Sequence, residues 1–335
     1  MNTFRTEIKL ADYPNKIHYE EAILCLGSCF ATHMSSKLLT HKFESLLNPF
    51  GILFNPYSIA KAIQWLCVGA DYKKEDLFFH DGLWHSFDHH GIFSHPDPEQ
   101  GLQQINSSLE KGRAFLLKSK WCVLTLGTAY VFQKKSDQKI VANCHKLPGS
   151  QFDRIKLSLD EVVQEMKIAI QNIRKQNPSI RFILTVSPVR HIRDGLVENQ
   201  RSKATLLLAT EQLVKELKEV YYFPAYELLL DDLRDYRFYE ADMIHPNQQA
   251  IDYIWKRFSG AFFGEKERLL MKEVHKLVLS AQHRPLHPDR EVHQKFVHAQ
   301  LKKMDELERK YAFLDFGRER GGCVRVYAEI ISKTD

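Results

Sequence analysis

Short, uninterrupted apolar runs recur along the chain, and helical patterns lie between them. The runs are residues 22–26 (AILCL), 121–126 (WCVLTL), 181–186 (RFILTV) and 220–223 (VYYF). Runs that are apolar throughout, rather than alternating, are typical of parallel strands covered on both faces. Helical spacing of apolar positions follows in 56–66, 159–173, 198–219 and 247–258. This alternation predicts a doubly wound α/β sheet.

Two of these helices have readable starts. Asn55 stands before Pro56, which places a capping side chain ahead of a proline at the first helical position. Ser158 and Glu161 have the spacing of a capping box. Both signals fix where the predicted helices begin.

Two further segments interrupt the alternation. Asp81-Gly82 stands between aromatic runs in 78–87, a strong signal for a two-residue hairpin turn. A second hairpin is predicted around Ser136-Asp137 in 130–142. We expect both at the rim of the sheet, where substrate loops usually lie.

Beyond about residue 265 the pattern becomes charged and amphipathic, with Pro285 and Pro288 between two helical stretches. It predicts a helical pair packed on the main domain or on a second subunit, and a strand or loosely held tail after Gly321-Gly322. The expected division is therefore an α/β domain over 1–262, with hairpins inserted near 76–95 and 129–142, and a helical extension over 263–335.

Composition narrows the class of protein. The 335 residues are 44% hydrophobic and 27% charged, enough for a core that needs neither disulfides nor metal. The net charge of +5 is spread without a long basic run, so neither it nor any motif favours a nucleic-acid partner. No run of about 18 apolar residues or signal-peptide pattern is present, and we expect no membrane partner. Scattered cysteines, several inside apolar runs, are typical of reduced thiols and favour a cytoplasmic location.

Ser28 is the first candidate for chemistry, because it follows the first apolar run in the stretch LGSCFA. A serine at a strand-to-helix turn lies at the carboxyl end of the sheet, where ligands bind in such folds. The turn also points backbone N–H groups toward a developing oxyanion. The alternative is an ordinary turn with a helix cap. Cys29 is a competing nucleophile, but the neighbour of an exposed turn residue normally points inward, which favours a buried thiol.

Asp242 and His245 form the second candidate, in the stretch DMIHP before a late helix. A carboxylate three residues before a histidine can hold one imidazole nitrogen, so that the other accepts a proton from a serine hydroxyl. The chain order Ser, Asp, His is one of several that build this arrangement. The alternative is a surface turn that caps a helix.

Together these segments resemble a known family. LGSCFA is similar to the signature of the GSCFA family, placed beside the SGNH, or GDSL, hydrolases, and Ser28, Asp242 and His245 match the first and last blocks of that superfamily. Further matching segments are NPFGILFNP (48–56), LGTAYVF (126–132), ANCHKLPG (142–149), TVSPVRHIRDG (185–195) and LRDYRFYEADMIHP (233–246). The resemblance covers roughly residues 5–260. It implies a flavodoxin-like three-layer α/β/α sandwich and ester hydrolysis or acyl transfer without a cofactor.

The chain departs from the superfamily at the oxyanion hole. That hole takes the N–H of the nucleophile, here Ser28, a glycine N–H from the second block and an asparagine amide from the third. Gly51 fits the second role, but the third block begins Gly127-Thr128 and holds no asparagine. Thr128, Asn48 and Asn143 are possible substitutes, of which we expect Asn143, although it can equally cap a turn. One lost donor typically costs on the order of 3 kcal/mol of transition-state stabilisation.

Other residues are candidates for substrate binding: Asn48, Thr128, His145, Arg190 and His191. Arg190 can clamp an anionic group or form a structural ion pair, and His191 can bind substrate or orient a loop.

A cluster of histidines in the first hairpin invites a metal interpretation, but its spacing matches no standard metal motif, and hydrogen-bonded or solvent-facing loop histidines are favoured. Trp84 and Phe87 beside them can stack on a sugar, although such residues more often pack on the core. The cluster is His80, His85, His89, His90 and His95.

The sequence therefore predicts a serine esterase or O-acyltransferase that acts on an O-acylated small molecule or carbohydrate through an acyl-serine. One alternative is a catalytically inactive fold that binds a glycan or protein, favoured by the missing asparagine. The other is a metal-dependent phosphoesterase built around the histidines. The C-terminal helices are also a candidate surface for a homo-oligomer.

Overall fold

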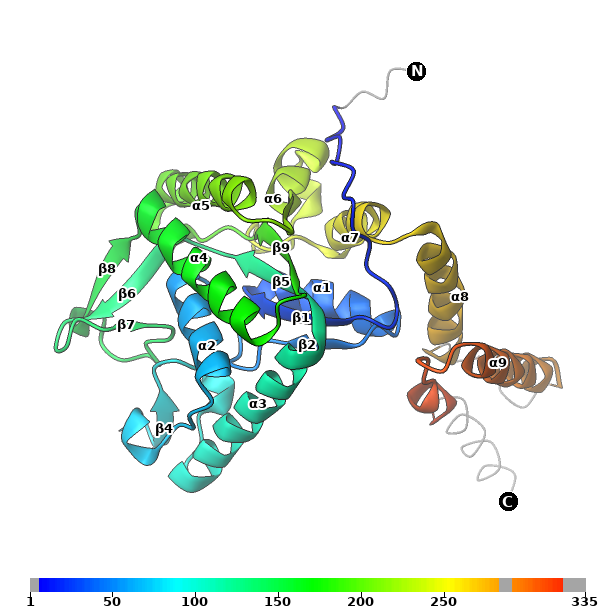
Figure 1. Cartoon of the computed structure of the whole chain (residues 1–335), viewed down its shortest axis with the longest axis horizontal. Coiled ribbons are helices and arrows are strands. Elements are labelled where there is room, and N and C mark those ends of the chain that lie inside the picture. Colours follow the sequence, from blue (N-terminus) through cyan, green and yellow to red (C-terminus); the bar gives the residue numbers. More distant parts are fainter. Residues whose placement is uncertain (1–5, 283–290, 322–335) are drawn as a thin grey trace.

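The computed structural model describes residues 6–282 and 291–321, and its centre is a parallel sheet (Figure 1). The strands have the order β10-β9-β5-β1-β2, and every neighbouring pair is parallel. They are β1 (Ala22–Gly27), β2 (Ser45–Leu47), β5 (Ser119–Leu126), β9 (Arg181–Val186) and β10 (Val220–Phe223). The predicted α/β class with a parallel sheet is confirmed.

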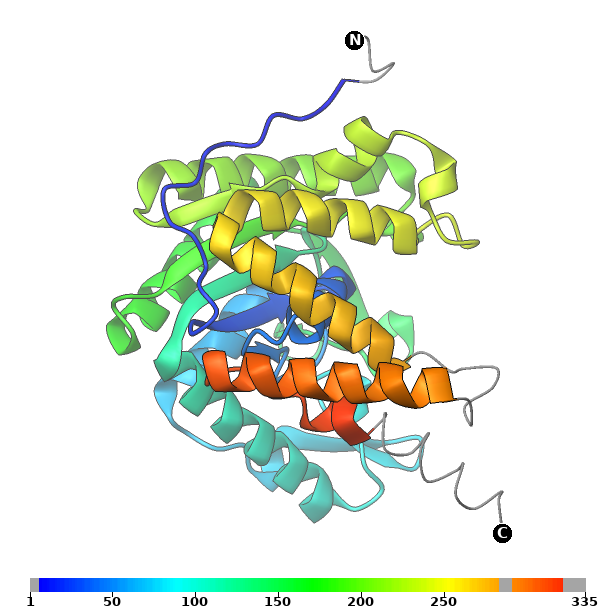
Figure 2. The same cartoon turned by 90° about the vertical axis from the view of Figure 1, so that its right-hand side faces the viewer.

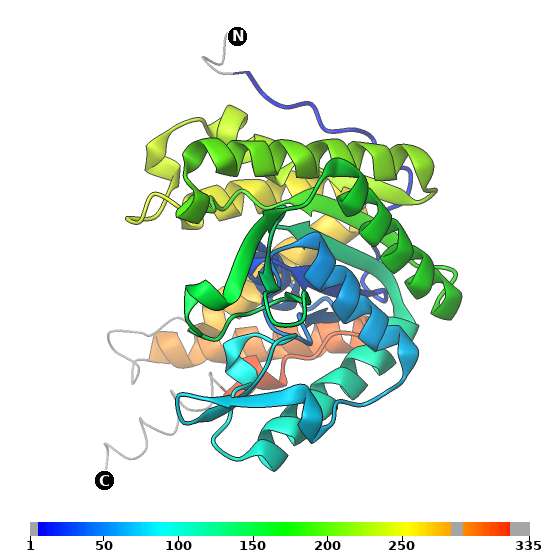
Figure 3. The ribbon, with the colours of Figure 1, turned by 90° about the vertical axis from the view of Figure 1, so that its left-hand side faces the viewer.

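Helices cover both faces of this sheet (Figures 2 and 3). On one face lie α1 (Cys29–Thr40), α7 (Gln248–Phe262), α8 (Glu265–Gln282) and α9 (Glu291–Lys310). On the other lie α2 (Pro56–Val68), α3 (Pro98–Lys118), α4 (Leu159–Gln176) and α5 (Leu196–Glu216), and the short α6 (Ala225–Glu227) follows β10. Successive strand residues alternate between the two cores, as Ile23 and Leu24 do, which explains why the strands are apolar throughout.

The order of the strands determines where a site can form. The second strand of the sheet lies on one side of β1 and the third, β5, on the other, as in flavodoxin-like sheets. Ligands in such folds bind outside the carboxyl ends of the strands, at the point where the order reverses. Here that point lies between β1 and β5, whose last residues pair as Gly27 with Thr125.

The first inserted hairpin has the expected turn. Strands β3 (Leu77–His80) and β4 (Leu83–Ser86) pair across Asp81 and Gly82, both with positive φ. That conformation is the type I′ turn that Asp-Gly favours, so the prediction is confirmed.

The second insertion is larger than predicted. Strand β6 (Tyr130–Lys134) pairs with β7 (Ile140–Val141), but also with β8 (Phe152–Lys156), in a small separate sheet. A further strand thus joins the predicted hairpin.

Both predicted helix starts are present. The Asn55 side chain accepts a hydrogen bond from Ser58 N–H at 2.8 Å, and Ser158 and Glu161 form the capping box. The third and fourth predicted helices correspond to α5 and α7, and their ends differ from the prediction by one to four residues. The sequence did not indicate α3 or the three-residue strand β2.

The C-terminal helices pack on the main domain rather than standing apart (Figure 2). Side chains of α8 and α9 share the core of the first face with those of β1 and α1. Pro285, Pro288 and the predicted strand or tail after Gly321 lie outside the described residues. In the ranges that are described, no helix is long and apolar enough to cross a membrane.

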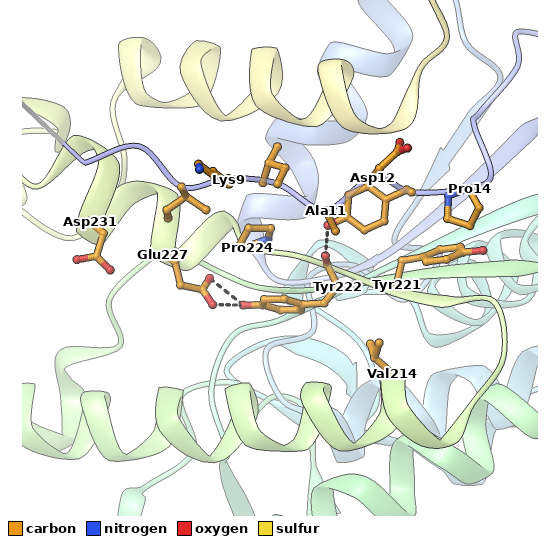
Figure 4. Close-up of a pocket in the computed structure, with 13 residues that line it drawn as sticks. Lys9, Ala11, Asp12, Pro14, Val214, Tyr221, Tyr222, Pro224, Glu227 and Asp231 are labelled. Carbon is orange, nitrogen blue, oxygen red and sulfur yellow. Dashed lines mark hydrogen bonds between the residues drawn. The ribbon is translucent and has the colours of Figure 1, made fainter. Parts of the chain in front are cut away.

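The N-terminal segment runs alongside the edge strand β10 and lines a groove with it (Figure 4). The Tyr13 hydroxyl donates to the backbone carbonyl of Tyr222, and the Tyr222 hydroxyl donates to the Glu227 carboxylate at 2.8 Å. Contacts of this kind cover a sheet edge that would otherwise be open to pairing with another chain.

Candidate active site

Ser28 lies at the N-cap of α1, immediately beyond the carboxyl end of β1. Its side chain makes no capping hydrogen bond and is 0% exposed. Within the described part of the chain, its Oγ has no hydrogen-bond partner. A buried hydroxyl without a partner is unusual in a protein, so this serine is not explained by a role as a helix cap.

The turn before Ser28 is held by backbone geometry and by Asn48. Gly27 has φ +134°, and a Cβ there would stand 2.1 Å from the Thr125 carbonyl oxygen. Asn48 accepts from Gly27 N–H at 2.8 Å and donates to Gly27 O at 3.1 Å. Asn48, predicted to bind substrate or an oxyanion, is therefore occupied in positioning the serine turn.

Asp242 and His245 form the pair that their spacing predicts. The Asp242 Oδ2 lies 2.6 Å from His245 Nδ1, and Oδ1 accepts the N–H groups of His245 and Ile244 at 3.0 and 2.8 Å. The hydrogen bonds from His245, followed by that from Ile244, lower the pKa of Asp242 to about 2. The carboxylate is thus ionised at neutral pH and holds one imidazole nitrogen, which leaves Nε2 available for a proton.

Arg190 ties this loop to the end of β9. Its N–H donates to Ile244 O and its Nη1 to Met243 O, both at 3.2 Å. Its guanidinium lies 4.2 Å from the centre of the Tyr239 ring. The contacts of Arg190 indicate a role in holding the loop of Asp242 and His245, and its role as an anion clamp stays a prediction.

Ser28, His191 and His245 belong to one neighbourhood at this edge. A Cβ built on Gly127 would stand 3.3 Å from Ser28 Cβ and 3.0 Å from His191 Nε2. The charge of His245 is one of the causes that lower the pKa of His191. In the described structure, however, no hydrogen bond joins the Ser28 hydroxyl to His245.

The groups expected to form the oxyanion hole are engaged elsewhere. Ser28 N–H donates to Thr125 O at 3.1 Å, and Gly51 N–H donates to Asn48 O at 2.7 Å. The turn at Gly51 also packs on His90, whose Cβ lies 2.3 Å from where a Gly51 Cβ would be.

The other two residues proposed to replace the missing asparagine, Asn143 and Thr128, make local hydrogen bonds. Asn143 donates its N–H to Phe87 O at 3.3 Å, and its Oδ1 accepts from His145 N–H at 2.9 Å. Thr128 Oγ1 lies 3.0 Å from Ser202 Oγ. The role of Asn143 as third donor stays a prediction, and its contacts are those of a turn.

His191 is held at its backbone and along its ring. Its N–H donates to Asn199 Oδ1 at 2.8 Å, and its ring meets the edge of Phe54 with centroids 5.5 Å apart. Its Nε2 is buried and has no hydrogen-bond partner among the residues the structure describes. Burial above all, and then the charges of Lys203 and Arg154, lower the pKa of His191 to about 3.

Three other histidines, near the first hairpin, make local hydrogen bonds. His145 Nε2 lies 2.7 Å from Ser86 O, and burial lowers the pKa of His145 to about 4. His85 Nδ1 lies 2.6 Å from Ser94 Oγ, and His89 Nδ1 lies 2.9 Å from Ser86 Oγ. Across residues 6–282 and 291–321 no group of three or more potential ligands is placed to hold a metal ion.

The nearby aromatic and thiol groups are also packed. Phe87 stacks on Phe78 with centroids 4.0 Å apart, and Trp84 packs against the core. The Cys29 sulfur accepts backbone N–H groups, but burial dominates and raises the pKa of its thiol. A raised pKa makes Cys29 a poor nucleophile at neutral pH.

Sequence reasoning missed Lys203, on α5. This side chain is 1% exposed, and its Nζ donates to Gly127 O at 2.7 Å and to Ser187 O at 2.6 Å. Burial lowers its pKa to about 7. The available signal was helical spacing, because Asn199, Lys203 and Leu206 fall on one inward face of the helix.

Comparison with protein families matches almost the whole chain. The model of the GSCFA family matches residues 22–258, and that of the "GSCFA domain protein, C-terminal domain" matches residues 274–324. No curated protein matches the sequence.

Several solved structures resemble the chain at low identity. A carbohydrate esterase family 3 structure from Talaromyces cellulolyticus is 10% identical, covers 76% of this chain and 99% of its own, and has a TM-score of 0.36. An acetyl xylan esterase from the rumen bacterium Butyrivibrio proteoclasticus is 9% identical, covers 73% of this chain and 64% of its own, and has a TM-score of 0.38. Overlaps of this extent establish neither substrate nor mechanism for this chain.

Proposed function

The chain belongs to the GSCFA family, and from that premise we propose that it is a serine esterase or O-acyltransferase that forms an acyl-serine on Ser28. The observation that carries the proposal is the 2.6 Å contact between Asp242 Oδ2 and His245 Nδ1. It lies at the same sheet edge as a serine hydroxyl that no helix-capping role explains. An oriented imidazole beside a serine is the arrangement that nucleophilic catalysis requires.

In the proposed reaction, Ser28 Oγ attacks the carbonyl carbon of an ester while its proton passes to His245 Nε2. Asp242 stabilises the resulting imidazolium, and negative charge collects on the former carbonyl oxygen. Collapse of this adduct expels the alcohol, which takes the proton from His245. Water or a second alcohol then repeats the sequence in reverse, which distinguishes an esterase from an acyltransferase.

An O-acylated small molecule or carbohydrate is the proposed substrate class, which rests on the resemblance to SGNH hydrolases. No cofactor is needed for this chemistry, because the serine, the imidazole and backbone groups supply the nucleophile, the base and the charge stabilisation.

The burial of Ser28 sets a requirement on this mechanism. Because the side chain is 0% exposed, the substrate must displace part of the covering structure before attack. The Ser28 hydroxyl must also rotate or approach to reach His245. The same burial favours the competing candidate, a catalytically inactive fold that binds a glycan or protein.

Labelling with a fluorophosphonate, which reacts with activated serines, separates these functions. We expect the wild-type protein to be labelled on Ser28, Ser28→Ala to lose the label, and His245→Gln to be labelled at least about 100-fold more slowly, because general-base catalysis contributes roughly that much. Peptide mapping by mass spectrometry identifies the labelled residue.

Ser107→Ala on the exposed side of α3 is the matched control, and it should be labelled like the wild type. Label that persists in Ser28→Ala would remove Ser28 as the nucleophile. A folded wild-type protein that takes no label would instead favour the inactive binding fold.

A further inference from the structure

The proposed acyl-serine chemistry needs hydrogen-bond donors for the oxyanion, and the expected ones are engaged. The N–H groups of Ser28 and Gly51 both donate to backbone carbonyls, and Thr128 stands where the superfamily has its asparagine block. A donor that acts without a rearrangement must therefore be an N–H beside Ser28 whose hydrogen is still available.

His191 has the position that this role demands. Gly127 lacks a side chain, and the site of a Cβ there lies 2.8 Å from Phe54 O, 3.0 Å from His191 Nε2 and 3.3 Å from Ser28 Cβ, so the three groups converge on one point. Nε2 therefore lies close to Ser28, and the oxyanion of an adduct on Ser28, two bonds beyond Oγ, can approach it without occupying the crowded point beside the Phe54 carbonyl. His191 Nε2 is buried there without a partner in the described structure.

Resting on the proposed function, we propose that His191 is a catalytic residue whose Nε2–H donates a hydrogen bond to the oxyanion formed on Ser28. It would replace the asparagine amide that the third block of this chain lacks. The proposal gives a role to a buried ring nitrogen that has no partner in the described structure and lies beside Gly127, and it supplies a substitute for the missing asparagine.

The electrostatics of His191 favour a donor over a base. Burial, Lys203 and Arg154 lower its pKa to about 3, so the ring is neutral at physiological pH and accepts a proton poorly. A neutral imidazole can still donate one hydrogen bond, as electrophilic histidines in other enzymes do. His245, whose Nδ1 is held by Asp242, remains the group suited to act as base.

The surrounding structure fixes the ring in place before any substrate arrives. Asn199 accepts the N–H of His191, and the edge of Phe54 packs against its ring. Lys203 joins the carbonyls of Gly127 and Ser187, so the two chain segments that meet at this point are held together. Donors fixed in this way need no reorganisation during the reaction.

The test compares two substitutions of His191 by the rate of Ser28 phosphonylation with a fluorophosphonate, whose phosphoryl oxygen occupies the oxyanion position. His191→Phe keeps a ring but has no donor, and we expect its rate to fall by about 10²–10³-fold. His191→Gln restores an N–H donor without a base, and we expect it to recover to within about tenfold of the wild-type rate. His191→Met is the second donor-free variant in case the Phe variant does not fold.

His298→Phe, on the exposed side of α9, is the matched control, and thermal melting confirms that each variant is folded. If His191→Phe reacts as fast as the wild type, His191 is not a donor, although the proposed function stands. If the Gln and Phe variants are equally slow, the donor role is overturned, because only ring shape or basicity then matters. If the wild type itself takes no label at Ser28, the proposed function fails first.

Discussion

At the scale of single residues, the site depends on a backbone conformation that only glycine adopts readily. Gly27 combines φ +134° with a backbone contact at 2.1 Å from the place of a Cβ. The close approach of β1 and β5 at this residue puts Ser28 directly above the end of β5. A side chain at 27 would push these strands apart and move the serine.

Gly27→Ala should therefore lower the free energy of unfolding by more than about 3 kcal/mol, since a strained φ and an overlap with backbone add together. Gly82→Ala measures the cost of a positive φ alone, because Gly82 has φ +77° but nothing within 4 Å of a Cβ. It should lower the free energy of unfolding by about 1–2 kcal/mol. Gly149→Ala has neither problem and serves as the control. Urea unfolding measures all three.

Equal losses for Gly27→Ala and Gly82→Ala would contradict the close packing of Gly27 on Thr125. A Gly27→Ala protein as stable as the Gly149→Ala control would contradict both the overlap and the strain.

At the scale of elements, α5 organises two loops at once. Along its inward face, Asn199 binds the backbone of His191, Ser202 binds Thr128 and Ala129, and Lys203 binds the carbonyls of Gly127 and Ser187. The loops after β5 and β9 thus share one support. Together with the hydrogen bond from Ser187 N–H to Leu126 O at 2.8 Å, this support places His191 against Gly127.

Lys203→Met tests this support through its pH dependence. The pKa of Lys203 is about 7 in the folded protein and 10.5 in an unfolded chain, so between these values the unfolded state binds one more proton. Stability due to Lys203 therefore rises with pH across this window, by about 1.4 kcal/mol per pH unit. Urea unfolding should therefore show that the free energy of unfolding of the wild type, relative to that of Lys203→Met, rises by about 1.4 kcal/mol for each pH unit between pH 7 and 10.

Lys272→Met, at an exposed position of α8, shows how much of the change arises from the loss of any lysine. A wild-type advantage that stays constant from pH 7 to pH 10 would mean that buried Lys203 binds its proton equally in both states.

The sequence predicts elements well where burial imposes a pattern, and poorly where it does not. Strand β9 is apolar along its length because both faces are covered, and its predicted bounds are those of the structure. Strand β2 spans only three half-buried residues, which are too few to show a recognisable pattern of apolar and polar positions. His191 was predicted to bind substrate or orient a loop, and not to act as an oxyanion donor, because the approach of its ring to Gly127 brings together two loops distant in the sequence.

At the scale of the whole molecule, the C-terminal helices complete a core that begins at β1. Phe316, beyond α9, is 0% exposed and belongs to the same cluster as Ile23 of the sheet. Phe313 stacks on Tyr19, which in turn stacks on Phe43 after α1, with centroids 5.1 and 4.1 Å apart. Contacts this continuous predict that the sheet and the C-terminal helices unfold together, although a separate family model matches the C-terminal part.

Phe316→Ala distinguishes one cooperative unit from two. Removing a buried phenylalanine costs about 3–5 kcal/mol, and in a single unit that loss lowers the stability of every element. We therefore expect one transition at a lower urea concentration, followed equally by helical circular dichroism and by fluorescence of Trp121 in the central sheet, measured in a background where the other three tryptophans are replaced by phenylalanine. Leu279→Ala, at a position 52% exposed on α8, should leave the midpoint nearly unchanged. If the two signals separate, with Trp121 unfolding as in the wild type, the C-terminal helices are an independent unit, and the active-site end of the sheet does not depend on them.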